Sequence, residues 1–259
     1  MKTLYGVIHL PALPGAPAAA LDLDAIEARA LADAAAYAEA GFGGLVLENY
    51  GDAPFLADRV GAETVAAMAR LARALRLARP DLALGVNVLR NDGEAALAVA
   101  ASAGADFILV NVLGGVSWSD QGPLVGRAAG ILRLRRSLGS AARIFADVDV
   151  KHAVMAAHAD PVHQAEDLLE RAGADALVVS GRATGAEPDA ALLKRLRERF
   201  GGGAALLVGS GLREDNAAVL LADADGAIVG TAVKEGGVTS RPVDPAAARR
   251  LAESVGHLL

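Results

Sequence analysis

The stretch Ala172-Gly173-Ala174-Asp175-Ala176-Leu177-Val178-Val179-Ser180 contains the pattern from which the fold can be predicted. An alanine–glycine pair precedes a short apolar run, and the run ends in a polar residue. Gly173 fits the position just past a helix end, where a left-handed backbone costs glycine little. A strand that is apolar at every position is typical of a parallel sheet buried on both faces. The stretch therefore indicates one unit of a parallel β/α fold.

Similar tetrapeptides precede three further apolar runs, at residues 40–43 (AGFG), 103–106 (AGAD) and 222–225 (ADAD). Together with residues 172–175, they precede the second, fourth, sixth and eighth predicted strands. This spacing is expected of a barrel built by duplication of a two-unit element. The alternative is that any loop from a helix to a strand favours Ala-Gly. Both interpretations place the strand starts at the same residues.

Short apolar strands and helical patterns alternate along the whole chain. The predicted strands are Leu4–His9, Gly44–Glu48, Leu82–Val88, Phe107–Asn111, Arg143–Val148, Ala176–Val179, Ala205–Val208 and Ala227–Val229. The predicted helices are Asp24–Ala40, Gly61–Arg79, Asp92–Ser102, Leu124–Leu138, Pro161–Ala172, Asp189–Arg199, Glu214–Leu221 and Pro245–Val255. Eight units in 259 residues favour one (β/α)8 TIM barrel, which typically takes about 250 residues, over two smaller domains or an open doubly wound sheet. We therefore predict an α/β protein with one barrel domain over residues 1–259.

Composition narrows the classes of function. The chain has no cysteine, which excludes disulfides, thiolate-bound zinc, iron–sulfur clusters and cysteine nucleophiles. Aromatic residues make up only 3% of the chain and the formal net charge is −6, so we expect no nucleic-acid partner. A local basic pocket for one phosphate is compatible with this charge. We expect a small-molecule ligand, and the sequence is compatible with a homo-oligomer.

Hydrophobic residues make up 53% of the chain, a share high enough to include membrane-spanning segments. No window reaches the roughly 18 uninterrupted apolar residues of a spanning helix. The apolar start of the chain is interrupted by His9, Pro11 and Pro14, and it lacks the order of regions found in export signals. We predict no integral membrane segment and a cytoplasmic protein.

Polar residues follow most of the predicted strands. In β/α barrels the carboxyl ends of the strands meet at one mouth, where the chemistry takes place. Any one polar residue there could cap a helix, but their convergence predicts a small-molecule site. The predicted substrate-binding residues are His9, Asn49, Asn87, Asn111, Ser180 and Arg182, with the asparagines placed to bind hydroxyl groups.

The fifth strand ends in the most chemically diverse group. Asp147, Asp149 and Lys151 are spaced by two, so they share one face if the strand stays extended. With Glu48 and His152 they form the predicted catalytic set. Several roles stay open for this group: acid or base catalysis, stabilisation of an oxocarbenium ion, a Schiff base on Lys151, binding of a divalent metal, or an internal salt bridge. No cofactor is required by the sequence, and a divalent metal stays an option.

Small residues follow the last two strands. Gly209, Ser210 and Gly211 follow the seventh strand, and Gly230 and Thr231 follow the eighth. Barrel enzymes often bind phosphate with these two loops and a short extra helix, because small residues let backbone N–H groups approach an anion. We predict phosphate binding here, with ordinary glycine turns as the alternative. Thr231 is predicted to open the short helix.

A glycine- and serine-rich connector follows the fourth strand. Residues 114–122 contain Trp118, the single tryptophan of the chain. Long loops at the mouth of a barrel often act as lids. We expect a mobile lid here, and an ordinary connector is the alternative.

Six motifs in order resemble the BtpA/SgcQ family, and the similarity extends over essentially the whole chain. They are residues 9–15 (HLPALPG), 48–55 (ENYGDAPF), 87–92 (NVLRND), 111–115 (NVLGG), 147–153 (DVDVKHA) and 180–185 (SGRATG). The resemblance implies a β/α barrel related to the ribulose-phosphate-binding group. One branch of that family is linked to photosystem I biogenesis as a stabilising factor at the thylakoid surface, and another to sugar metabolism or nucleosidase activity. The resemblance supplies no catalytic residue set.

Two classes of function follow. The first is an enzyme that hydrolyses or lyses a glycosidic-type bond in a phosphorylated sugar or nucleoside-like substrate. Its carboxylates would act as acid, as base, or in stabilising the positive charge that develops at the sugar. The second is a non-catalytic photosystem I assembly factor, which would need an exposed apolar or basic docking surface. The polar residues at one mouth favour the enzyme.

Overall fold

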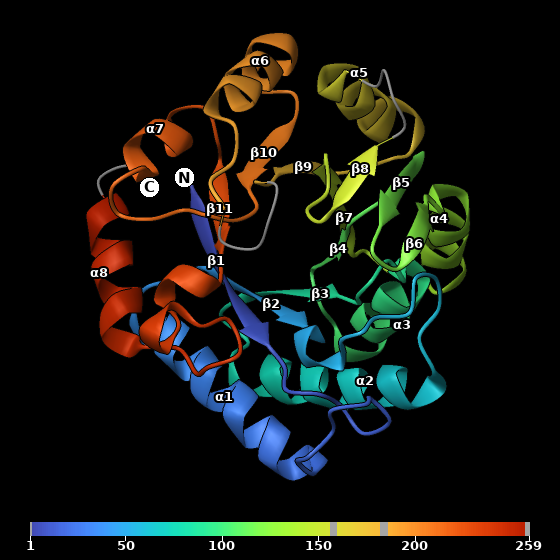
Figure 1. Cartoon of the computed structure of the whole chain (residues 1–259), viewed down its shortest axis with the longest axis vertical. Coiled ribbons are helices and arrows are strands. Elements are labelled where there is room, and N and C mark those ends of the chain that lie inside the picture. Colours follow the sequence, from blue (N-terminus) through green and yellow to red (C-terminus); the bar gives the residue numbers. More distant parts are fainter. Residues whose placement is uncertain (1, 156–159, 182–185, 257–259) are drawn as a thin grey trace.

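The computed structural model describes residues 2–155, 160–181 and 186–256. Eight parallel strands close into a barrel in the order β1-β11-β10-β9-β7-β4-β3-β2, and helices surround it (Figure 1). The barrel strands are β1 (Thr3–His9), β2 (Gly44–Glu48), β3 (Ala83–Asn87), β4 (Phe107–Val110), β7 (Arg143–Val148), β9 (Ala176–Val179), β10 (Ala205–Val208) and β11 (Gly226–Val229). Pairing of Tyr5 with Gly44 and of Thr3 with Gly226 joins the first strand to both neighbours, so the predicted TIM barrel is confirmed.

The outer layer consists of helices packed on the barrel. They are α1 (Leu23–Glu39), α2 (Ala62–Ala78), α3 (Gly93–Ala103), α4 (Ala128–Ser137), α5 (Pro161–Glu166), α6 (Ala190–Phe200), α7 (Ala217–Ala222) and α8 (Pro245–Val255), with a π-helical turn, η2 (Asp167–Arg171), after α5. Five of them begin after an aspartate whose carboxylate accepts a backbone N–H of the first turn, as N-caps do. These aspartates are Asp22, Asp92, Asp160, Asp189 and Asp244.

The inside of the barrel is a separate apolar core. It is formed by Tyr5, Val7, Val46, Phe107, Leu109, Phe145, Ala176, Val178, Leu207 and Ile228. These residues are spaced by two along their strands, since alternate side chains of a strand point to opposite faces. The same alternation directs the residue two positions beyond the last core residue, such as Glu48 after Val46, to the inside of the barrel mouth.

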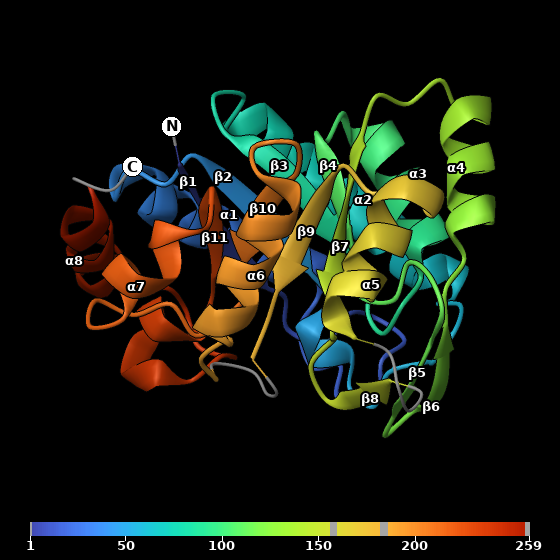
Figure 2. The same ribbon diagram turned by 90° about the horizontal axis from the view of Figure 1, so that it is seen from above.

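The connector after β4 contains regular structure. It forms β5 (Val116–Ser119) and β6 (Gly122–Val125), which pair with each other and with β8 (Ala153–Met155) as a small antiparallel sheet at one end of the barrel (Figure 2). The helix predicted from Leu124 therefore begins only at Ala128. Leu124 instead pairs with Ser117, and its side chain is fully buried in a small cluster with Val112 and Val150.

Candidate active site

A polar layer lies directly on top of the barrel core. His9 pairs with Glu48, and Glu48 pairs with Asn87, at the ends of β1, β2 and β3. Asp147 is the corresponding inward residue of β7, two positions after the core residue Phe145. Three neighbouring strands thus end at the same level, so their polar side chains converge on one volume.

This volume is a cavity of about 480 Å³ at the carboxyl ends of the strands. That size falls in the usual range for small-molecule sites, about 300–1,000 Å³. The residues predicted from the sequence that line it are His9, Glu48, Asn87, Asn111, Asp147, Lys151, His152, Gly209, Ser210, Gly211, Gly230 and Thr231.

Two carboxyl groups in the cavity are each held by an asparagine. Asn87 Nδ2 donates to Glu48 Oε2 at 2.7 Å, and Asn111 Nδ2 donates to Asp147 Oδ2 at 2.7 Å. Burial raises the pKa of Glu48 above its ordinary value, while the Lys151 charge and the Asn87 hydrogen bond oppose the rise. Burial also raises the pKa of Asp147, opposed by Lys151 and Asn111. Both shifts favour the protonated form of a carboxyl, which is the form that donates a proton in general acid catalysis.

The two carboxyls influence each other's ionisation. The negative charge of Asp147 is a further cause that raises the pKa of Glu48. Like charges in one site favour the protonated form of one member. The pair therefore favours a state in which one carboxyl is ionised and the other keeps its proton.

Lys151 reaches the same cavity through a sharp turn after β7. Asp149 and His152 have positive φ angles of 57° and 54°, in the left-handed region that aspartate and histidine visit more readily than most residues. The buried Arg90 donates to the backbone oxygen of Lys151, and Lys151 Nζ donates to Gly209 O at 3.1 Å. Burial lowers the pKa of Lys151, while Asp147 and Glu48 raise it.

The same turn corrects the prediction for Asp149. The strand ends at Val148, so the alternation that would have aligned Asp149 with Asp147 and Lys151 is interrupted. Asp149 is exposed, and its backbone N–H donates to Gln164 Oε1 at 3.2 Å. It is not among the described residues that line the cavity.

His9 is a neutral member of the layer. Burial, with the charges of Lys234 and Lys151, lowers its pKa well below the ordinary value. Its Nε2 lies 3.8 Å from Glu48 Oε1, and its ring meets Tyr50 edge-on at 5.0 Å between centroids. Neutral imidazole can act as an acceptor or donor beside a protonated carboxyl.

The two predicted phosphate loops form one side of the cavity. The loop after β10 is fixed by the buried Asn216, whose Oδ1 accepts Arg213 N at 2.8 Å and whose Nδ2 donates to Gly211 O at 2.9 Å. After β11, Thr231–Val233 forms the expected short helix, a single 3-10 turn. A Cβ on Gly230 would lie 2.6 Å from the His9 ring, so glycine leaves the room that His9 occupies.

Two predicted substrate-binding residues, Asn49 and Ser180, do not line the cavity. Asn49 is fully buried and holds the backbone of Leu89, accepting from its N–H at 2.7 Å, so it shapes the scaffold instead of lining the cavity. Ser180 Oγ is buried and packs where a Cβ on Gly209 would be, 2.4 Å away. Arg182 lies outside the described residues.

Several lining residues were missed because they do not end a strand. They are Tyr50, Phe55, Arg90, Asp120, Gln121 and Arg213. Arg90 lies three residues beyond Asn87 in the 87–92 motif, which is the signal that could have identified it. Asp120 and Gln121 form the tip of the β5–β6 hairpin, so the connector contributes to the cavity as a structured hairpin.

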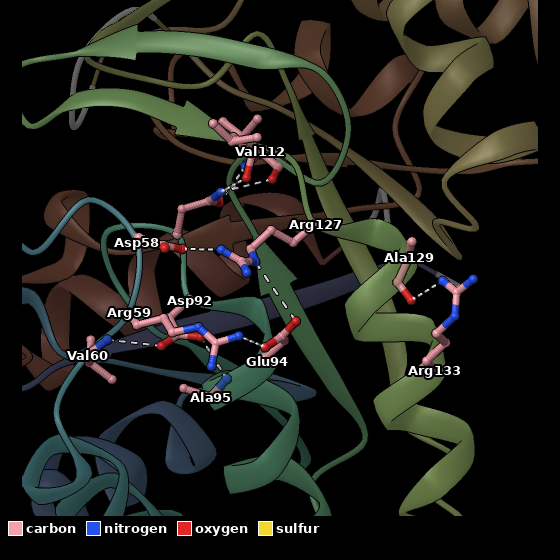
Figure 3. A network of polar contacts seen from close by, with 12 residues as sticks. Asp58, Arg59, Val60, Asp92, Glu94, Ala95, Val112, Arg127, Ala129 and Arg133 are labelled. Atoms are coloured by element: carbon pink, nitrogen blue, oxygen red, sulfur yellow. Dashed lines mark hydrogen bonds and ion pairs between the residues drawn. The ribbon is translucent and has the colours of Figure 1, made fainter.

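A polar network anchors the segment that carries Phe55 (Figure 3). Asp92 accepts Val60 N at 3.0 Å while capping α3 through Ala95 N at 2.9 Å. Around it, Arg59 pairs with Glu94 at 2.6 Å, and Arg127 pairs with Asp58 at 2.7 Å. These contacts fix the loop between β2 and α2 against the base of the hairpin.

Metal ligands do not gather in the part of the chain that the structure describes: no group of three or more histidine, aspartate or glutamate side chains is arranged to hold an ion. No helix in the described ranges is both long enough and apolar enough to span a bilayer.

The fold and cavity define a (β/α)8 barrel with a buried polar site at the carboxyl ends of its strands. The profile of the BtpA family matches residues 1–257, and the chain belongs to this family.

Similar proteins extend over nearly the whole chain. An uncharacterised protein of Pyrococcus horikoshii is 45% identical over 260 residues, covering 99% of this chain and 97% of its own length. The photosystem I biogenesis protein BtpA of Synechocystis is 40% identical over 244 residues, covering 93% and 84%. Thiamine phosphate pyrophosphorylase from Pyrococcus furiosus shares the fold, with a TM-score of 0.61 at 15% identity, covering 100% of this chain and 97% of that one.

Proposed function

We propose that the protein is an enzyme that cleaves a glycosidic-type bond in a phosphorylated sugar or nucleoside-like substrate, by hydrolysis or lysis. The observation that carries the proposal is the pair of carboxyls, the half-buried Glu48 and the buried Asp147, each held by an asparagine amide at 2.7 Å in one cavity. Bond cleavage at an anomeric carbon needs a proton for the leaving group and a negative charge beside the developing cation.

A coupled pair of carboxyls permits a division of roles. Glu48, whose pKa is raised by burial and by the charge of Asp147, would donate a proton to the leaving group. Asp147 in its ionised form would stabilise the positive sugar carbon or activate water as a base. His9, 3.8 Å from Glu48, would keep this carboxyl oriented.

The opposite side of the cavity suits the phosphate. Gly209, Ser210 and Gly211 line it next to Gly230 and Thr231, and small residues allow the close approach of an anion to the backbone. Arg213 stands at the same rim and adds positive charge. The phosphate would thus be held away from the carboxyls, with the sugar spanning the distance between them.

A release assay tests the proposal. Nucleosides, nucleoside 5′-monophosphates and other ribose phosphates are incubated with the protein, and newly formed reducing sugar is measured. Glu48→Gln and Asp147→Asn should each lower kcat by about 10²–10⁴-fold, the usual contribution of a positioned acid or base. Asp149→Asn is the matched control, since Asp149 is exposed outside the cavity, and it should retain activity. Turnover that survives in both cavity variants would contradict the proposal.

A second candidate is an assembly role like that of the photosystem I biogenesis protein of Synechocystis, to which 93% of the chain aligns. One observation favours it. Trp118 is 58% exposed and pairs across strands with Val154, which is 71% exposed, so both lie on the outer face of the small sheet. Exposed apolar patches of this kind often bind other proteins.

Complementation distinguishes the two candidates. The chain is expressed in Synechocystis lacking its own BtpA, and photosystem I content is measured. An assembly role predicts restoration by Asp147→Asn and failure of Trp118→Ser. An enzymatic role predicts the opposite result, namely failure of Asp147→Asn and restoration by Trp118→Ser. Trp118→Ser should then also be as active as the unaltered chain in the release assay.

A further inference from the structure

We propose that Lys151 is a covalent catalytic residue, whose amine forms an imine with the aldehyde carbon of an open-chain sugar phosphate in the cavity. This inference rests on the proposed phosphorylated-sugar site and adds a bond-forming step to it. The released sugar of a glycosidic cleavage carries its aldehyde at the carbon that was attacked. An amine beside that carbon can bind the sugar covalently as an imine, which keeps it in the cavity for a later bond-cleaving step.

The position of the Lys151 amine supports this role. Its side chain lines the cavity, and its Nζ donates to the backbone oxygen of Gly209 at 3.1 Å. It forms no ion pair with a carboxylate of the described residues, although Asp147 and Glu48 both influence its ionisation. The amine is therefore close to two proton carriers without being bound tightly by either one.

The backbone around Lys151 is arranged to direct it inward. Left-handed residues flank it at Asp149 and His152, and such positions cluster at functional sites because the surrounding structure must enforce them. The buried Arg90 donates to the Lys151 backbone oxygen and fixes the turn. Burial also lowers the pKa of the amine, which increases its neutral, nucleophilic fraction.

Lys234 shows what a structural lysine looks like in the same fold. The chain has four lysines, at positions 2, 151, 194 and 234. Lys234 is buried, but its Nζ forms an ion pair with Asp33 at 2.7 Å, and it does not line the cavity among the residues described. Asp33 also accepts Val243 N at 2.8 Å, so this pair joins α1 to the segment after β11. Lys151 differs because its amine lines the cavity and donates to a backbone oxygen, that of Gly209.

The chemical step balances without an external redox partner. Neutral Nζ attacks the aldehyde carbon, and one of its two protons passes to the carbonyl oxygen to give a neutral carbinolamine. Glu48 then supplies a proton to the departing hydroxyl, water leaves, and a carbon–nitrogen double bond forms. Asp147 accepts the proton lost from nitrogen.

Reductive trapping tests the inference. The full-length protein is incubated at pH 7 with ribose 5-phosphate and cyanoborohydride, which reduces an imine to a stable secondary amine. Peptide mass mapping then locates the adduct. We expect labelling of Lys151 at least about tenfold faster than labelling of the exposed Lys194, because amine reactivity follows the neutral fraction. Labelling spread equally over Lys2, Lys151 and Lys194 would overturn the inference, as would labelling that spares Lys151.

Variants and a second sugar complete the experiment. Lys151→Arg, which keeps the charge but removes the nucleophile, should abolish the fast adduct, whereas Lys194→Arg should leave it unchanged. Bare ribose is run in parallel. Equal labelling of Lys151 by ribose and by ribose 5-phosphate would support the covalent lysine and contradict the phosphate site of the proposed function. A fast adduct that persists in Lys151→Arg would overturn the lysine inference alone.

Discussion

At the residue scale, the chemistry depends on carboxyl groups that the fold keeps out of water. Glu48 and Asp147 stand at the carboxyl ends of two barrel strands, above an apolar core, and burial is the largest cause of the raised pKa in both. An ionised carboxylate in such a place lowers the stability of the folded state. Stability and function therefore conflict at these two positions.

Replacement of Asp147 by asparagine should stabilise the protein at pH 8. Because the pKa of Asp147 is raised in the folded protein, ionisation of this carboxyl lowers the free energy of unfolding. This loss of stability is absent at low pH, where Asp147 is protonated in both the folded and the unfolded protein. It is complete above the raised pKa. Relief of strain at functional sites typically gives about 0.5–2 kcal/mol, which for a chain of this size corresponds to about 2–4 °C in Tm per kcal/mol. Thermal unfolding from pH 3.5 to 8 measures the effect. A variant less stable than the unaltered chain at pH 8 would contradict the assignment.

At the element scale, the loops around the cavity depend on buried polar anchors. Asn216 holds the loop after β10 with two hydrogen bonds, one to Arg213 N and one to Gly211 O. Asn216→Ala should cost about 1–3 kcal/mol per buried group left unpaired and should weaken binding of phosphorylated ligands. Asn216→Asp keeps the acceptor for Arg213 N and serves as the control. Its stability and its affinity for phosphorylated ligands should lie between those of the unaltered chain and of Asn216→Ala. Calorimetric Kd values that are equal in all three proteins would show that the loop does not bind phosphate.

The network of Figure 3 gives a second test at this scale. Asp92 is buried, caps α3 and holds Val60 N, whereas Arg127 and Asp58 form a largely exposed pair. Asp92→Ala should destabilise the protein by about 0.5–2 kcal/mol, the usual cost of a lost N-cap. Arg127→Ala should cost less than about 1 kcal/mol, as exposed ion pairs do. Denaturant unfolding measures both, and the opposite order would refute the role given to Asp92.

At the scale of the whole molecule, the barrel was predictable because the middle of each barrel strand is apolar and five of the helices begin after a capping aspartate. The positions of Glu48, Asn87 and Asp147 followed from the rule that strand carboxyl ends share one mouth. Other features depend on tertiary contacts. Asp149 leaves the mouth because the backbone turns at a positive φ, and the β5–β6 hairpin forms because Leu124 is buried against Val112. Neither interaction is visible in local sequence patterns.

The central claim is that this mouth binds a phosphorylated sugar, and titration calorimetry with ribose 5-phosphate tests it most directly. The unaltered protein should show saturable binding at one site. Ser210→Asp, which places a negative charge in the phosphate loop, should weaken that binding by at least about tenfold through like-charge repulsion. Ser137→Asp adds the same charge on the exposed end of α4 and should leave the Kd unchanged. Absence of binding by the unaltered protein, or an undiminished affinity in Ser210→Asp, would contradict the account.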